Sequence, residues 1–186
     1  MERARDKAVT GMNDKDLKKD RYVIRDFRGE DAETLSELIR RDIREVTYED
    51  PEWEREYLYN FYVPENIKKN AETGHTYVIE DADTGKIVAT GTIKKDSPAR
   101  EGAENEAEIR GCFIDADSLR KGIGSLLFDA LENDPAFLSA ARVWLTTSVY
   151  AREFYENRGY RYSFGYRGKN EDNLTEMEKI PAQKND

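Results

Sequence analysis

Cysteine and histidine are almost absent from this chain of 186 residues, which contains only Cys112 and His75. A single cysteine cannot form an internal disulfide, so we expect a reducing, cytoplasmic compartment. One cysteine and one histidine cannot supply the usual tetrad of a zinc site, and one histidine argues against serine–histidine hydrolysis. We therefore expect no metal, a surface position for His75, and a small core residue rather than a nucleophile in Cys112.

Long apolar runs and an excess of positive charge are also missing. No run approaches the ~20 residues that cross a membrane, and residues 1–20 lack the apolar segment of a secretory signal. The formal net charge of -9 argues against a general nucleic-acid-binding surface. We expect no membrane partner and no general nucleic-acid partner. The acidic balance instead favours a cationic partner, such as a small amine or a basic peptide.

The composition is that of a folded chain, with 38% hydrophobic, 11% aromatic and 37% charged residues. This length can bury a core without disulfides or metals. Residues 1–20 are polar and lack periodicity, which predicts a flexible N-terminal arm. We expect residues 21–180 to form one domain, followed by a short tail over residues 181–186.

Hydrophobic periodicity predicts alternating strands and helices along this domain. The predicted strands are 21–27, 75–81, 86–94, 106–115, 141–149, 160–167 and 174–180. The predicted helices are 29–46, two short helices within 51–70 divided at Pro64, one after Gly124, and one over 150–159. This order predicts an α/β fold, with a mixed, twisted central sheet of about six to seven strands and helices on both faces.

The stretch "LRKGIGSLL" (119–127) places two glycines, Gly122 and Gly124, where a predicted strand passes into a helix. The unpaired N–H groups and the dipole at a helix N-terminus form an anion site. Arg120 and Lys121 add positive charge. The spacing is neither a Walker loop nor a complete G-x-G-x-x-G fingerprint. Two interpretations stay open: the glycines form a phosphate site, or they only make a tight turn.

The context of these glycines resembles the GCN5-related N-acetyltransferase (GNAT) superfamily. "EIRGCFIDADSLRKGIGSLLFDAL" resembles its motif A, a strand, a turn and R/Q-x-x-G-x-G/A opening a helix. "YAREFYENRGY" resembles its later A-x-x-x-Y-x-x-x-G-F motif, matched here by Ala151, Tyr155, Gly159 and Tyr160. Two positions depart from the pattern. Leu119 replaces the usual Arg or Gln of motif A, and Ser148 stands near the place of a usual Asn.

The resemblance implies an acetyl-CoA site where the fourth and fifth strands splay apart. The pantetheine arm would pair with the free edge of the fourth strand at Phe113 and Ile114, next to a bulge near Gly111 and Cys112. The pyrophosphate would bind the amides of Arg120, Lys121, Gly122, Ile123, Gly124 and Ser125. The implied reaction is direct acetyl transfer from acetyl-CoA to a primary amine in a ternary complex without a metal. In the superfamily the final strands often mediate a homodimer.

Tyr155 matches the position of the acid that protonates the leaving thiolate in this superfamily, and a buried aromatic on a helix face is the alternative. Glu108, early in the fourth strand, is the predicted general base. Strand alternation places Glu108 and Arg110 on the face opposite Ile109. A solvated strand carboxylate is the alternative for Glu108, and Glu106 on the same face is the second candidate for the base.

The stretch "YLYNFYVP" (57–64) is dense in aromatic residues, which favours core packing or, alternatively, a wall of the acceptor pocket. Acidic residues precede it, and they predict either a solvated run or a site for a cationic amine. These residues are Glu49, Asp50, Glu52 and Glu54. Three functions remain open: an amine N-acetyltransferase, an acyl-CoA-binding sensor without turnover, and a nucleotide-phosphate-binding domain unrelated to CoA.

Overall fold

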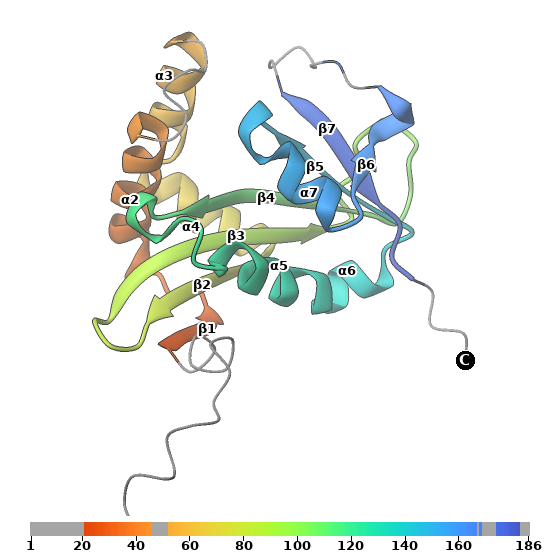
Figure 1. Ribbon diagram of the computed structural model, residues 1–186. Helices are drawn as coiled ribbons and strands as arrows, with labels where there is room; N and C mark the ends of the chain where they lie inside the picture. The colour runs from red at the N-terminus through yellow and green to blue at the C-terminus, as the bar shows by residue number, and fades with distance from the viewer. Residues whose placement is uncertain (1–20, 46–51, 167, 169–173, 183–186) are drawn as a thin grey trace, which may run out of the picture.

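The protein is built on one seven-stranded sheet with strand order β1-β2-β3-β4-β5-β7-β6 (Figure 1). The computed structural model describes residues 21–45, 52–166, 168 and 174–182. The strands are β1 (Tyr22–Asp26), β2 (His75–Asp81), β3 (Lys86–Lys95), β4 (Glu106–Ile114), β5 (Arg142–Thr147), β6 (Arg161–Tyr162) and β7 (Thr175–Lys179). Among the described strands, only β4 and β5 are paired in parallel. The predicted mixed sheet is therefore confirmed.

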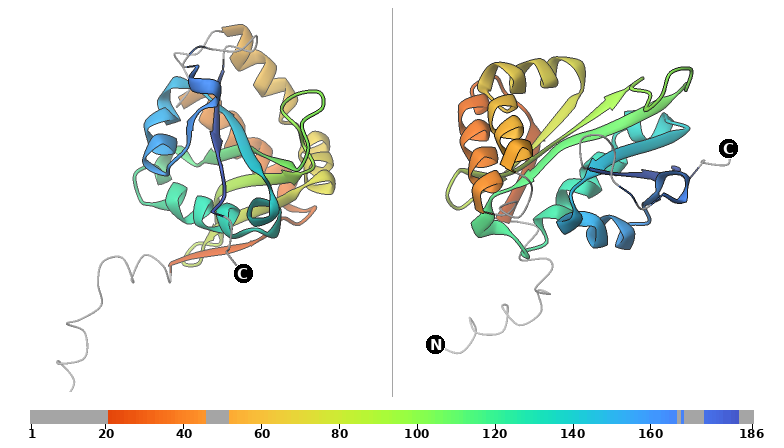
Figure 2. Two further views of the ribbon diagram at one scale, coloured as in Figure 1. Left: turned by 90° about the vertical axis from the view of Figure 1, so that its right-hand side faces the viewer. Right: turned by 90° about the horizontal axis from the view of Figure 1, so that it is seen from above.

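Helices cover both faces of this sheet, as the sequence predicted. They are α2 (Asp31–Glu45), α3 (Glu52–Phe61), α4 (Pro64–Thr73), α5 (Ile123–Asn133), α6 (Pro135–Ser139) and α7 (Arg152–Asn157). Figure 2 shows α2, α3 and α4 on one side of the sheet and α5, α6 and α7 on the other. Pro64 occupies the first turn of α4, where its missing N–H costs nothing.

Each face of the sheet has its own hydrophobic core, because successive strand residues point to opposite sides. Val78 packs with Leu35 and Ile39 of α2, whereas its neighbour Ile79 packs with Leu127 of α5. The helix α2 contributes one apolar stripe at 3.6-residue spacing, which is the pattern of an amphipathic helix. The two cores hold the helices that border the functional site.

The sheet opens between β4 and β5. Their parallel pairing runs only from Glu106↔Arg142 to Ile109↔Leu145, although β4 continues for five more residues. Opposite β3, the register places one residue, Gly91, across from both Gly111 and Cys112, so β4 carries a bulge there. Gly111 has φ +62°, which favours glycine. The predicted splay and the predicted bulge are both present.

Two local features of the structure differ from the predictions. The short helix α6 was not predicted; Asp134 caps it by accepting a hydrogen bond from Ala136 N at 2.7 Å. The strand predicted over 160–167 is reduced to β6, because a 3-10 turn with left-handed Phe164 and Gly165 follows it at once. The arm predicted over 1–20 and most of the 181–186 tail lie outside the described residues.

None of the helices in the described part of the chain is long and apolar enough to cross a membrane. Within the same residues, no group of three or more His, Cys, Asp or Glu side chains is arranged to hold a metal ion.

His75 ties two distant parts of the fold together. Its Nδ1 lies 2.5 Å from the buried Asp134 Oδ2, and its Nε2 lies 3.0 Å from Asp26 Oδ1. Tyr77 also donates its hydroxyl to Asp134 at 2.8 Å. An imidazolium donates from both nitrogens, so the two carboxylates favour the charged form. Burial lowers the pKa of His75, but the hydrogen bonds to Asp26 and Asp134 outweigh burial and leave the pKa above 6.5.

We therefore predict a pH-dependent contribution of His75 to stability. A raised pKa means that this contribution is complete below pH 6.5 and is lost as the pH rises through the folded-state value. The measurement is the melting temperature of wild type and His75→Gln at a series of pH values from below 6.5 to alkaline pH. The difference between the two proteins should be largest in acid and should shrink at alkaline pH. A difference that stays constant with pH would contradict this assignment.

Candidate active site

A cavity of about 740 Å³ occupies the opening between β4 and β5. Three groups of elements border it. The first is the last turn of α2 together with α3 and Tyr62, and the second is the pair of splayed strands. The third comprises the segments that lead into α5 and α7. The principal lining residues are Asp42, Leu58, Tyr62, Glu108, Phe113, Ile114, Arg120, Gly122, Gly124, Ser125, Ser148, Phe154 and Tyr155. The cavity thus reaches both faces of the sheet through the gap.

The N-terminus of α5 borders this cavity. Gly122 is the N-cap residue, with φ +83°, and the first hydrogen bond of the helix runs from Leu126 N to Gly122 O at 3.1 Å. The amides of residues 123–125 precede this bond, so they have no partner inside the helix. Arg120 and Lys121 are exposed beside them. These groups together form a site that suits an anion.

The two glycines of this turn have different physical roles. A side chain at Gly122 would meet open space, so this position needs glycine for its left-handed backbone. A Cβ at Gly124 would lie 3.2 Å from Ile114 Cδ1 and 3.3 Å from Phe154 Cε2. Gly124 therefore lets α5 pack closely against β4 and α7. The two interpretations made from the sequence, a tight turn and an anion site, are therefore compatible with each other and with the observed geometry.

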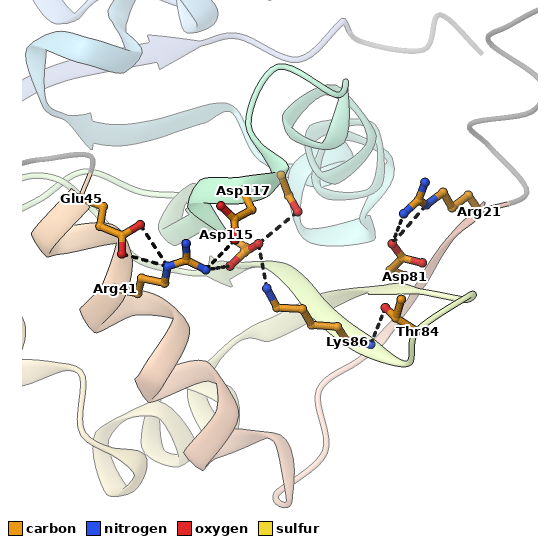
Figure 3. A network of polar contacts seen from close by, with 9 residues as sticks. Arg21, Arg41, Glu45, Asp81, Thr84, Lys86, Asp115 and Asp117 are labelled. Carbon is orange, nitrogen blue, oxygen red and sulfur yellow. Dashed lines mark hydrogen bonds and ion pairs between the residues drawn. The ribbon is translucent and has the colours of Figure 1, made fainter.

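A polar network holds the segment between β4 and this turn (Figure 3). The buried Asp115 accepts from Arg41 of α2 at 3.3 Å, from Lys86 of β3 at 3.0 Å and from Ser118 at 3.2 Å. Arg41 also pairs with Asp117 at 2.9 Å. The cations offset the cost of burying Asp115. The network fixes the turn relative to both α2 and β3.

Phe113 and Ile114 lie beyond the last β4–β5 pair, so their backbone edge toward β5 is free. On the other edge they pair with Thr90 and Ala89 of β3. Phe113 also makes an edge-to-face contact with Tyr62 at 4.9 Å. This is the edge at which the sequence predicted pairing with a pantetheine arm.

The predicted acid, Tyr155, lies in α7 on the α5 side of the sheet and lines the cavity. Its ring packs against Phe128 and Phe154 at 5.3 Å each and against Tyr160 at 5.8 Å. Burial, with a smaller contribution from Cys112, raises the pKa of Tyr155 well above its usual value of 10. The hydroxyl therefore keeps its proton, as an acid must before the reaction.

Glu108 lies on the opposite side, among the residues that face α2 and α3. It lines the cavity, but Ser97 Oγ donates to its Oε2 at 2.9 Å, and Arg110 Nη1 lies 3.7 Å from the same oxygen. The second candidate, Glu106, is not among the cavity-lining residues. It pairs with Arg142 at 3.1 Å and accepts from Ala99 N at 2.8 Å, so its role here is structural.

One cavity residue, Asp42, was missed from the sequence. Asp42 is only 8% exposed, and no described residue forms a hydrogen bond or ion pair with it. Burial, together with the nearby charges of Asp115 and Glu45, raises the pKa of Asp42 to about 7. Tyr62 is also buried, and burial raises its pKa to about 12. In the sequence Asp42 looks like an ordinary polar member of a helix face, whereas Tyr62 belongs to the aromatic run that was a candidate for the acceptor wall.

The predicted acceptor wall is therefore smaller than the aromatic run suggested. Of its aromatic residues only Tyr62 lines the cavity, accompanied by Leu58. Tyr57 is 61% exposed and stacks on Phe61 at 5.9 Å. Among the acidic residues, Glu52 is exposed outside the cavity lining, while Glu49, Asp50 and the side chain of Glu54 lie outside the described part.

Residues 33–160 match the family model described as the acetyltransferase (GNAT) family. The chain belongs to this family. The matched region begins in α2 and ends at Tyr160, so it contains every cavity residue described above. A search of curated proteins finds no match for this acetyltransferase.

Solved structures of acetyltransferases share the fold of this GNAT protein at low sequence identity. The PaiA N-acetyltransferase from Thermoplasma acidophilum in complex with coenzyme A has TM-score 0.69 and 18% identity, over 86% of this chain and 98% of that one. A GNAT acetyltransferase from Staphylococcus aureus Mu50 has TM-score 0.64 and 18% identity, over 87% and 99%. One from Streptococcus pneumoniae has TM-score 0.60 and 20% identity, over the same shares.

The burial of Asp42 in this acetyltransferase predicts that Asp42→Asn raises stability at neutral pH. The pKa of about 7, against the usual 3.8, means that the folded protein resists ionisation of this carboxyl. Wild-type stability should therefore fall as the pH rises from 3.8 to about 7. Since one pKa unit corresponds to about 1.4 kcal/mol, the gain from the substitution has an upper limit of roughly 4 kcal/mol above pH 7.

The measurement is thermal or denaturant unfolding of both proteins from acid to alkaline pH. The two unfolding curves should converge in acid, where the wild-type carboxyl is neutral. A loss of stability in Asp42→Asn that is the same at every pH would show that the carboxylate has a partner in solution.

Proposed function

We propose that this protein transfers an acetyl group from acetyl-CoA to the primary amine of a small cationic molecule or a basic peptide. The observation that carries the proposal is the cavity in the β4–β5 opening, which joins an anion-binding helix N-terminus to a buried tyrosine. Family membership supports acyl transfer in general terms. The cavity supports the finer choice of donor and acceptor.

The residues present fit acetyl-CoA as the donor. The free edge of β4 at Phe113 and Ile114 offers backbone groups to the amides of a pantetheine arm. The amides of residues 123–125, with the exposed Arg120 and Lys121 and the hydroxyl of Ser125, suit a pyrophosphate. The similar T. acidophilum structure contains coenzyme A, which supports the same class of ligand here. Bound acetyl-CoA would supply an activated thioester.

The chain's own groups would then perform three tasks. Tyr155 keeps its proton at neutral pH and is positioned on the cavity wall to deliver it to a leaving thiolate. The backbone N–H groups at the bulge in β4 are candidates for stabilising the developing oxyanion. A carboxylate on the α2 side accepts the proton of the incoming ammonium, and Glu108 is the residue that the sequence predicted for this task.

A second candidate function is an acyl-CoA-binding sensor without turnover. Leu119, which replaces the usual Arg or Gln of the family motif, is 38% exposed and lines the cavity, so a polar side chain is missing beside the anion site. A nucleotide-binding domain unrelated to CoA is the third possibility, and it would use the same glycine turn. Ligand choice separates this last function from the other two.

The first test is a calorimetric titration with acetyl-CoA, with CoA and ATP as comparison ligands. We expect saturable binding of acetyl-CoA and CoA and little binding of ATP, because only the CoA ligands carry the pantetheine arm that pairs with β4. Binding should weaken as salt is added, since part of it is attraction to phosphate. Preference for ATP would support the nucleotide-binding alternative, and binding to none of the three would refute the proposed site.

The second test is the variant Tyr155→Phe, which removes the hydroxyl and keeps the ring packing. General acid–base catalysis contributes roughly 10²–10⁴-fold, so we expect kcat to fall by about 100-fold while acetyl-CoA affinity stays the same. Tyr160→Phe is the matched control, because Tyr160 belongs to the same aromatic cluster but not to the cavity lining. Unchanged turnover in Tyr155→Phe would remove this residue from the mechanism.

A further inference from the structure

The least satisfied charged group in the cavity is Asp42. Its side chain lies in the last turns of α2 and faces the cavity, although the residue is only 8% exposed. No described residue donates a hydrogen bond to it or pairs with it. A buried carboxyl without a partner costs free energy. A donor that arrives with a ligand would offset that cost.

The charged groups around Asp42 leave it available to a cation. Asp115 at the end of β4 and Glu45 one turn further along α2 act on it with like charge. Two cations that contact Asp115 and Glu45 are already paired: Arg41 pairs with Glu45, Asp115 and Asp117, and Lys86 pairs with Asp115 (Figure 3). The net effect on Asp42 disfavours its charged form until a positive ligand is bound.

Glu108, the other carboxyl group on this side of the cavity, is held differently. Its Oε2 accepts the hydroxyl of Ser97 at 2.9 Å and faces Arg110 at 3.7 Å. These two partners hold the Glu108 carboxyl group in a fixed position. A base that works near neutral pH needs a carboxyl that exchanges its proton there, and the pKa of Asp42, about 7, meets this requirement. Two carboxyl groups in different environments commonly take different roles.

We propose that Asp42 binds the ammonium group of the acceptor and accepts its proton, directly or through one water, while Glu108 keeps its contacts with Ser97 and Arg110. This inference rests on the proposed acetyl transfer. The ammonium loses one proton to the Asp42 carboxylate and becomes a neutral amine. Its lone pair forms a bond to the thioester carbonyl carbon, and the carbon–sulfur bond breaks. The leaving thiolate takes a proton from Tyr155, which regains one from the nitrogen, and Asp42 later releases its proton to solvent.

The positions of the three residues agree with this division. Asp42 and Glu108 border the cavity on the α2 side, together with Tyr62, whereas Tyr155 borders it on the α5 and α7 side. The proton acceptor and the proton donor thus lie on opposite walls of the same opening. An amine that enters from the α2 side would meet Asp42 before it reaches the other wall.

The test compares Asp42→Asn, Glu108→Gln and the control Asp83→Asn, which removes one charge from an exposed residue of the β2–β3 turn. Thiol release from acetyl-CoA is followed from pH 6 to 9 with a linear triamine, an aminosugar and a lysine-containing peptide. In Asp42→Asn we expect KM for the amine to rise by about tenfold and kcat/KM to fall by roughly 100-fold. KM for acetyl-CoA should stay within about twofold.

The pH profile separates a catalytic role from a structural one. Wild-type kcat/KM for the amine should fall on the acid side near the pKa of Asp42, and this limb should disappear in Asp42→Asn. Glu108→Gln should keep the limb and lose less than about tenfold in kcat/KM. The inference is overturned if Asp42→Asn behaves like Asp83→Asn, if only KM for acetyl-CoA changes, or if Glu108→Gln is the variant that removes the limb.

A binding measurement keeps this inference separable from the proposed function. The triamine is titrated calorimetrically into CoA-saturated wild type and Asp42→Asn. Binding by wild type alone, even without turnover, would support the ammonium site and refute only acetyl transfer. Turnover with equal amine binding and equal rates in both proteins would refute Asp42 and leave acetyl transfer standing. Neither binding nor turnover in wild type would refute both.

Discussion

The end of the β4–β5 pairing at Ile109 and Leu145 is the constraint on which the rest of this structure depends. Parallel strands that stay paired leave no space between them for a ligand. Here β4 bulges at Gly111 and Cys112 and continues without β5. Its free backbone edge, the cavity and the access from both faces of the sheet all follow from that single loss of pairing.

The opening also decides how charge is arranged around the cavity. The helix N-terminus at Gly122 supplies N–H groups on one side of the gap, and the carboxyl groups of Asp42 and Glu108 border the other. Arg41 links the two, since it comes from α2 and holds Asp115 and Asp117 just before the glycine turn. A displacement of α2 would therefore change the geometry of the anion site as well as the position of Asp42.

Buried titratable groups give the site its chemical character. Tyr155 remains protonated because burial raises its pKa, and Asp42 is hard to ionise because it is buried and lies near the like charges of Asp115 and Glu45. His75 shows the opposite case outside the cavity. There two carboxylates flank one imidazole, favour its charged form and join β1 and β2 to the segment before α6. Desolvation and the presence of a counter-charge decide the direction in each case.

Much of the fold could be predicted because local patterns there agreed with tertiary packing. Periodicity placed α2, β2, β3 and β4, and the glycines at 111 and 122 marked the bulge and the helix cap. The predicted strand over 160–167 failed because Phe164 and Gly165 take left-handed conformations that strand propensity does not reveal. The helix α6 was missed because it is one short turn and depends on the cap at Asp134.

The sequence by itself determined the order of strands and helices, the glycine turn, the position of Tyr155 and the family resemblance that connects them. These features depend on residues that are close together in the sequence, so their spacing can be recognised without a structure. Only the tertiary structure decided which carboxyl groups share the cavity. In the folded protein Glu106 pairs with Arg142, and Glu108 contacts Ser97 and Arg110. Asp42 has no hydrogen-bond or ion-pair partner among the described residues. Such partners come from segments that are distant in the sequence. Whether a carboxyl group is buried with a partner or without one therefore depends on how the whole chain packs.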